Sequence, residues 1–199
     1  FHYLAWRNLA HELVFEFTKK QNERFKGVSR VRSLEILLEI GGVQATQEQK
    51  DGWLISKNEE YLSYISKMTA DDILPGVLKV LNYLRDKNIP MALGSASKNA
   101  QPILKRVGLF ERFDCIVDGN HVTKAKPDPE VFTIGADELG VAYEDAIVFE
   151  DSIAGIQAAN RVNMVSVGIG DAQVLNEADH NFNDFTEIDT SFLDQLINA

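Results

Sequence analysis

The stretch Ala146-Ile-Val-Phe-Glu-Asp-Ser-Ile-Ala-Gly-Ile156 indicates the fold class of this chain. It opens with a short apolar run, which is typical of a strand that is buried on both faces. Two carboxylates, Glu150 and Asp151, follow the run, and a helical pattern begins directly after Ser152. A buried strand that passes at once into a helix predicts one unit of a parallel α/β sheet.

The second part of the chain repeats this alternation of buried strands and helices. Three more short apolar runs occur, at residues 91–94, 115–117 and 164–167. Amphipathic helical patterns occupy residues 77–87, 99–107, 129–139, 153–162 and 190–198. Four buried strands separated by helices predict an α/β fold with a Rossmann-like parallel sheet.

Residues 1–70 show helical patterns without a strand signal. Apolar residues recur there at steps of three and four, and Gly41-Gly42 separates two of the helical stretches. We therefore expect two domains, a small helical unit over residues 1–70 and an α/β domain over residues 71–199.

Composition and charge exclude several classes of function. The 199 residues are 45% hydrophobic and 25% charged, as in ordinary globular proteins. The formal net charge of −10 argues against a general nucleic-acid or anionic-membrane binder, which would carry a basic field. No apolar stretch approaches the roughly 18 residues of a membrane span, and no signal peptide is visible.

The single cysteine, Cys115, cannot form an internal disulfide, so we expect a cytoplasmic protein. Cys115 lies in a predicted strand, which favours a structural role over that of a nucleophile.

Polar residues follow three of the predicted strands. They are Ser95 with the residues up to Asn99, Lys126 before Pro127, and Glu150 with Asp151. Ligands of parallel α/β sheets bind outside the carboxyl ends of the strands. We therefore expect these residues to meet in one site.

The residue types at these strand ends suit phosphate chemistry. A serine hydroxyl with backbone amides at a helix start can cradle a phosphoryl group, although Ser95 also fits an ordinary N-cap. Lys126 can balance phosphate charge, although most lysines are solvated. Glu150 and Asp151 repel one another unless a cation offsets them, which favours Mg²⁺ over the alternative in which Asp151 or Ser152 simply caps the next helix.

Taken together, Ser95, Lys126 and Glu150-Asp151-Ser152 resemble the second, third and fourth motifs of the haloacid dehalogenase superfamily, in order and in spacing. The resemblance implies phosphoryl transfer with Mg²⁺ on Glu150 and Asp151, and Ser95 and Lys126 as catalytic residues. It also implies a helical cap domain inserted after the first strand, which would be central in the sheet and end in Asp-x-Asp. The first of these aspartates would accept the phosphoryl group, and the second would act as acid and base.

No Asp-x-Asp follows an apolar run ahead of the predicted cap in residues 1–199. We expect this strand and its aspartates upstream of Phe1, because a sheet without its central strand would leave two open edges.

Several segments are similar to those of β-phosphoglucomutases within this superfamily. They are His2 to Trp6, Phe25 to Arg30, Ser56 to Asn58 and Ala92 to Asn99. The similarity implies that His2 assists the acid/base aspartate. It further implies that substrate is bound by Lys26, Gly27, Arg30, Lys57, Ala96, Ser97, Lys98 and Asn99. Of these, Arg30, Ser97, Lys98 and Asn99 would hold the distal phosphate, and Gly27 and Lys57 would line the sugar site.

The resulting expectation is a monomeric enzyme that interconverts β-glucose 1-phosphate and glucose 6-phosphate, a phosphorylated hexose being its only partner. One alternative is a small sugar-phosphate or phosphoglycolate-type phosphatase of the same superfamily. Another is a non-catalytic homologue that serves as a binding module. Taken singly, His2, Lys57 and Arg30 also fit structural roles, with Arg30 as a partner of Glu35.

Overall fold

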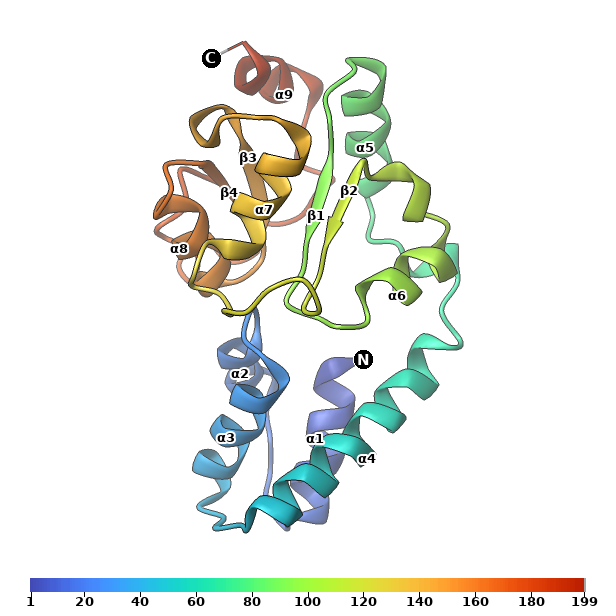
Figure 1. The fold of residues 1–199 in the computed structure, drawn as a ribbon, viewed down its shortest axis with the longest axis vertical. Coiled ribbons are helices and arrows are strands. Elements are labelled where there is room, and N and C mark those ends of the chain that lie inside the picture. Colours follow the sequence, from blue (N-terminus) through green and yellow to red (C-terminus); the bar gives the residue numbers. More distant parts are fainter. Residues whose placement is uncertain (199) are drawn as a thin grey trace.

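The computed structural model describes residues 1–198, and its first part is helical (Figure 1). Four α-helices gather at one end of the molecule: α1 (His2–Glu12), α2 (Lys19–Asn22), α3 (Arg30–Gly41) and α4 (Gln47–Ile65). A 3-10 turn, Glu23–Phe25, follows α2. Ser29 and Thr46 cap the starts of α3 and α4 by accepting backbone hydrogen bonds, and Gly42 ends α3 in the left-handed conformation.

Apolar residues from three of these segments form the core of the helical part. Trp6, Phe17, Leu34 and Leu37 are each at most 2% exposed. The Trp6 and Phe25 rings meet edge to face, with centroids 5.7 Å apart. The helical unit predicted from periodicity is present, and its boundary at residue 70 remains a prediction.

The second part of the chain alternates strands and helices as the sequence predicts, and the α/β fold class is confirmed. The strands are β1 (Ala92–Gly94), β2 (Cys115–Val117), β3 (Ile147–Glu150), β4 (Val165–Ile169) and β5 (His180–Phe182). The helices are α5 (Val77–Asp86), α6 (Ala100–Val107), α7 (Glu130–Leu139), α8 (Ile153–Asn160) and α9 (Thr190–Ile197). Three 3-10 turns lie at Ala70–Asp72, Phe110–Arg112 and Tyr143–Asp145.

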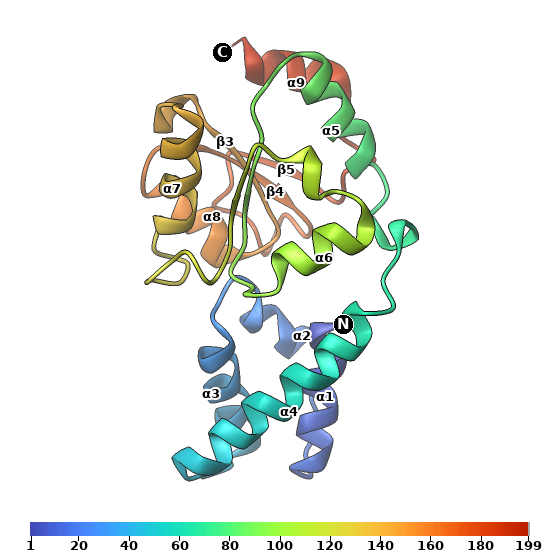
Figure 2. The same ribbon diagram turned by 45° about the vertical axis from the view of Figure 1, so that its right-hand side comes forward.

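Helices cover both sides of the strands: α5 and α6 lie on one side, and α7 and α8 on the other (Figure 2). Two apolar clusters correspond to these layers. Leu81, Met91 and Leu104 belong to the first, and Ala136, Val148, Ala159 and Met164 belong to the second. A parallel sheet needs such cover on both faces, because its strands are apolar throughout.

All strand pairs are parallel, and they form two sheets among residues 1–198. β1 pairs with β2, and β3, β4 and β5 pair in that order. Within the described residues, β1 and β3 are therefore each at the edge of a sheet. A further strand between them stays a prediction.

The strand β5 was missed by the sequence reading. Its three residues include two polar ones, His180 and Asn181, so no apolar run marks it. The register on β4 pairs Val167 with His180 and Ile169 with Phe182. Pairing with β4, and not the composition of residues 180–182, thus determines that this segment is a strand.

Cys115 lies on β2 and is partly buried, and burial raises the pKa of its thiol. Across residues 1–198, no helix combines the length and the apolar character that a membrane crossing requires.

Candidate active site

Lys126 contacts the carboxyl ends of both β1 and β3. Its ammonium group donates hydrogen bonds to the Gly94 carbonyl at 3.2 Å and to Glu150 Oε2 at 2.6 Å. Lys126 is only 6% exposed, and the Phe132 ring covers the ammonium at 4.5 Å from its centroid. A buried lysine of this kind is held by the carboxylate and carbonyl that it contacts, because an unpaired buried charge is unfavourable.

Glu150 is held on both of its carboxylate oxygens. Oε2 accepts from Lys126, and Oε1 accepts from the Ser152 hydroxyl at 2.6 Å. Ser152 is 2% exposed and caps α8, where its hydroxyl oxygen accepts from the Gly155 amide at 3.0 Å. The start of α8 therefore fixes the orientation of Glu150.

Asp151 differs from Glu150 because its side chain is 63% exposed. The Lys26 ammonium approaches its carboxylate at 3.5 Å and also contacts Glu23 at 3.0 Å. Burial acts to lower the pKa of Lys26, but the hydrogen bond to Glu23 and the charge of Asp151 keep that pKa above its ordinary value.

The donor set at this end of the strands fits Mg²⁺ in part. Glu150 and Asp151 supply two carboxylates, and Mg²⁺ is commonly bound by one or two carboxylates together with substrate phosphate. Within residues 1–198, no three His, Cys, Asp or Glu side chains cluster closely enough to form a metal site alone. The assignment of Mg²⁺ to these two residues remains a prediction.

The loop from Ser95 to Asn99 joins β1 to α6. The Ser95 amide donates to the Val117 carbonyl, and the Ser95 hydroxyl accepts from the Ser97 amide at 3.1 Å. In the same way the Ser97 hydroxyl accepts from the Asn99 amide at 3.1 Å. Asn99 occupies the N-cap position of α6, so Ser95 is not the cap of this helix. Ala96 and Lys98 lie in the same loop, and the Lys98 carbonyl accepts from Asn120 at 3.1 Å.

Lys57 on α4 lies in a buried aromatic cage. It is 3% exposed, and its ammonium nitrogen is 3.0 Å from His2 Nδ1. The nitrogen also lies 4.4 Å from the Trp6 ring centroid and 4.9 Å from that of Tyr61. These ring faces favour the charged amine. Burial and the charge of Arg30 act in the opposite sense and lower the pKa of Lys57 to about 7.

His2 is neutral at physiological pH in this setting. Burial and the charge of Lys57 lower its pKa to about 3, and its ring stacks on Tyr61 at 3.8 Å between centroids. When the Lys57 amine is charged it can only donate, so Nδ1 of His2 accepts in that state and the proton of the neutral ring lies on Nε2. His2 can therefore donate one hydrogen bond from Nε2 to a group in the site.

Arg30 begins α3 and faces the same cage. Burial lowers its pKa, and its charge acts on both His2 and Lys57. The alternative in which Arg30 pairs with Glu35 is wrong, because Arg32 forms that ion pair at 3.0 Å.

Direct contacts join the helical part to the strand ends. Asn99 donates to Asn58 Oδ1 at 3.2 Å, and Lys26 reaches Asp151. Gly27, in the left-handed conformation at φ 73°, lies so near Ser152 that an added Cβ would stand 2.5 Å from its hydroxyl oxygen. All predicted substrate residues thus lie in the segments that border this junction.

A family model of the haloacid dehalogenase-like hydrolases matches residues 2–163. The chain belongs to this family. A β-phosphoglucomutase of Bacillus subtilis is 39% identical over 181 residues, which cover 90% of this chain and 80% of that protein. A phosphorylated carbohydrates phosphatase of Thermotoga maritima is 29% identical, covering 87% of this chain and 82% of that protein.

The crystal structure of a β-phosphoglucomutase from Clostridium difficile superposes with a TM-score of 0.91 at 37% identity. The match covers 99% of this chain and 89% of that one. The family expected from the sequence is confirmed. The chain is a β-phosphoglucomutase-like enzyme of the haloacid dehalogenase-like family, and phosphoryl transfer is its class of reaction.

Some contacts of the site were not predicted from the sequence, although Ser152, Asn58 and Trp6 lie in the segments that carry the family resemblance. Ser152 bonds Glu150, Asn58 bonds Asn99, and Trp6 with Tyr61 forms the cage around Lys57. Burial raises the pKa of Tyr61 to about 12, so it stays a neutral phenol. The sequence marked Asn58 only as part of the segment Ser56 to Asn58, which is similar to β-phosphoglucomutases, and gave it no role.

We expect the lowered pKa of Lys57 to appear in the pH dependence of stability. The pKa of Lys57 is about 7 in the folded protein and 10.5, the ordinary lysine value, in the unfolded chain, so the unfolded chain binds more protons between these pH values. The contribution of Lys57 to the free energy of unfolding therefore rises with pH from about 7 to about 10. Urea unfolding at several pH values should show that wild type gains stability relative to Lys57→Met across this window. The exposed Lys67→Met variant is the control and should track wild type; a constant difference between wild type and Lys57→Met would contradict the assignment.

Proposed function

We propose that this enzyme interconverts β-glucose 1-phosphate and glucose 6-phosphate through an aspartyl phosphate, with Mg²⁺. The observation that carries the proposal is the placement of two cationic groups outside the Lys126–Glu150 centre. Arg30 and Lys57 lie in the helical part, close enough for the charge of Arg30 to lower the pKa of Lys57, and Asn58 beside Lys57 accepts a hydrogen bond from Asn99. A phosphatase needs one phosphate site, whereas a mutase that works through a bisphosphate needs two.

In this proposal, Lys126 and Ser95 hold the phosphoryl group that is transferred. The Lys126 ammonium is fixed by Gly94 and Glu150, so its charge is in place before substrate arrives. Mg²⁺ bound by Glu150 and Asp151 would offset negative charge on the same group. The nucleophilic and acid/base aspartates are the sequence-based expectation stated above.

At the opposite end of the substrate, Arg30, Ser97, Lys98 and Asn99 bind the second phosphate. The guanidinium of Arg30 can donate two parallel hydrogen bonds to one phosphate group. Lys57, Gly27 and Lys26 border the sugar, and His2 donates from Nε2. Transfer of the phosphoryl group from the aspartyl phosphate to the hexose 1-phosphate forms a hexose 1,6-bisphosphate. This bisphosphate turns end for end in the site and transfers its other phosphoryl group to the aspartate, which leaves the 6-phosphate.

The proposal is tested by following β-glucose 1-phosphate with the full-length protein, Mg²⁺ and a trace of glucose 1,6-bisphosphate. We expect glucose 6-phosphate as the product, detected by coupled reduction of a nicotinamide. Arg30→Met should lower mutase kcat/KM about a hundredfold, because charged hydrogen bonds to the distal phosphate contribute about 1.5–3 kcal/mol each. It should change hydrolysis of a small monophosphate much less.

The matched control is Arg24→Met, because Arg24 is an exposed arginine of the same helical part that pairs with Glu39. It should retain mutase activity. Release of free glucose and inorganic phosphate alone would overturn the mutase and favour a sugar-phosphate phosphatase. That second candidate is favoured by the 29% identity to the phosphorylated carbohydrates phosphatase.

A further inference from the structure

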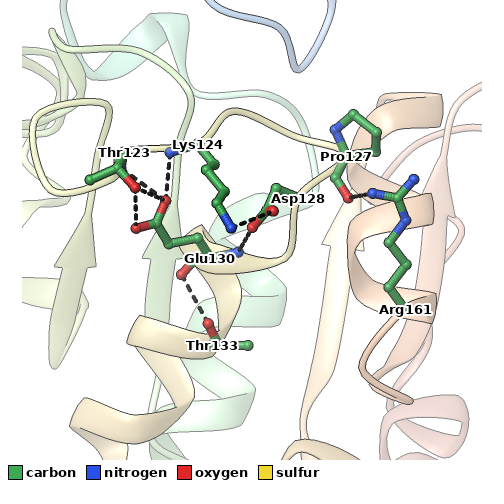
Figure 3. Close-up of polar contacts among 7 residues, drawn as sticks. All are labelled: Thr123, Lys124, Pro127, Asp128, Glu130, Thr133 and Arg161. Atoms are coloured by element: carbon green, nitrogen blue, oxygen red, sulfur yellow. Dashed lines mark hydrogen bonds and ion pairs between the residues drawn. The ribbon is translucent and has the colours of Figure 1, made fainter.

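Lys126 belongs to the loop between β2 and α7. Two side chains from outside this loop and outside the active site, Glu130 and Arg161, form hydrogen bonds to its backbone and act as fixed points for it (Figure 3). A lysine side chain is flexible and loses rotamer freedom when it is fixed. The position of the Lys126 ammonium group therefore depends on where the backbone of Lys126 is held. The contacts of the loop show how this is done.

The first fixed point is Glu130, at the start of α7. Glu130 Oε2 accepts from the amides of Thr123 and Lys124 at 2.8 and 2.6 Å, and the Thr123 hydroxyl donates to both carboxylate oxygens (Figure 3). The hydrogen bonds from these amides and the hydroxyl lower the pKa of Glu130, so the carboxylate is charged at neutral pH. The Glu130 side chain thus holds the backbone of the two residues, Thr123 and Lys124, that lie shortly before Lys126 in the loop.

The second fixed point is Arg161, which follows the last residue of α8. Its guanidinium Nη1 donates to the Pro127 carbonyl at 2.6 Å (Figure 3). Pro127 directly follows Lys126. Arg161 therefore holds the peptide next to Lys126 from outside the site, on an exposed side of the molecule.

Helix α8 links this second point to the other half of the ion pair. Ser152 at its start bonds Glu150, and Arg161 at its end bonds the residue after Lys126. Helix α8 is a short rigid element that spans about 12 Å at 1.5 Å per residue. The two ends of α8 thus help to hold both members of the Lys126–Glu150 pair, Glu150 through Ser152 and Lys126 through Arg161.

We infer that Arg161 and Glu130 are positioning residues that clamp the loop and set where the Lys126 ammonium lies. The inference rests on the role proposed for Lys126 in phosphoryl transfer. A misplacement of about 1 Å can cost about a hundredfold in rate, so a distant hydrogen bond of this kind affects the chemistry. Neither residue touches the reacting atoms.

Two measurements on Arg161→Met test the clamp in the full-length protein. The first is the rate at which an amine-modifying reagent labels Lys126, read by peptide mass spectrometry and requiring no catalysis. We expect about a tenfold increase, which corresponds to the loss of one charged hydrogen bond. Labelling of Lys57 should stay constant, because that lysine is equally buried in the helical part and reports general loosening.

The second measurement is the kinetic split in the mutase assay. Arg161→Met should lower kcat about tenfold and leave KM within about twofold, because the transferring group and not the distal phosphate loses its partner. Arg161→Lys should restore part of the rate by donating a single hydrogen bond. The control is Arg106→Met, an exposed arginine on α6, which should match wild type in both measurements.

Glu130→Ala tests the other fixed point and should change Lys126 labelling in the same direction. Unchanged labelling of Lys126 in Arg161→Met would overturn the clamp, and so would a parallel increase at Lys57. The labelling result is independent of turnover. If the protein lacks mutase activity, the proposed function fails while the labelling still decides whether Arg161 positions Lys126.

Discussion

Lys126→Met is expected to reduce phosphoryl transfer by at least about a thousandfold, because it removes a preorganised charge from the site. The same substitution should lower the free energy of unfolding by about 3–5 kcal/mol, because it leaves Glu150 as an unpaired buried carboxylate. The side chains of this pair are only 4% and 9% exposed. Steady-state kinetics and urea denaturation measure the two effects.

The double variant Lys126→Met/Glu150→Gln separates these effects. Glutamine removes the uncompensated charge, so the double variant should regain part of the lost stability and none of the lost activity. The exposed Lys67→Met variant should match wild type in both measurements. Retention of more than a tenth of the wild-type rate by Lys126→Met would show that the lysine does not act on the transferred group.

Gly155→Ala is expected to disrupt the site through packing alone. A Cβ at Gly155 would overlap the Cγ, Cδ and Oε2 atoms of Glu150. Glu150 cannot move without breaking its bonds to Lys126 and Ser152. We expect a loss of about 1–3 kcal/mol in stability, typical of overpacking, and a fall of about a hundredfold in activity from misplacement of the carboxylate.

The matched control is Gly52→Ala, which lies within helix α4. Apart from its two chain neighbours and the backbone of its own helix, nothing lies within 4 Å of a Cβ added there. Alanine should stabilise the protein by about 0.5–1 kcal/mol, because glycine is unfavourable in a helix interior. Thermal unfolding and activity measure both variants. A Gly155→Ala protein with wild-type activity would show that Glu150 has room to shift without consequence.

Elements with strong periodicity could be predicted from the sequence. The apolar runs before Ser95 and Glu150 both became strands, and the helices between them lie within a few residues of their predicted positions. β5 could not be predicted, because the ladder on β4 determines it and not its own residues. Apolar periodicity reports burial, so it misses a strand whose side chains are mostly polar.

The candidate site was only partly readable from the sequence. Motif order identified Lys126, Glu150 and Asp151, and in the structure Lys126 Nζ lies 2.6 Å from Glu150 Oε2. The cage around Lys57 was not readable, since residues as distant in sequence as Trp6 and Tyr61 form it. The catalytic, substrate and metal roles remain predictions. Arg161 gave no signal, because a hydrogen bond to a carbonyl depends on the path of the backbone and not on a pattern of side chains.

Movement of the helical part away from the strands requires the hydrogen bond between Asn99 and Asn58 to break. Asn58 neighbours Lys57 on α4, so breaking this bond would also loosen the helix segment that borders the sugar in the proposed function. In the proposed function, the same opening would expose the buried Lys57 amine to water and release the product. In many enzymes such opening, and not the chemical step, limits turnover. We therefore expect the rate of proton exchange at the Lys57 amine to report the rate of opening, measured without any substrate.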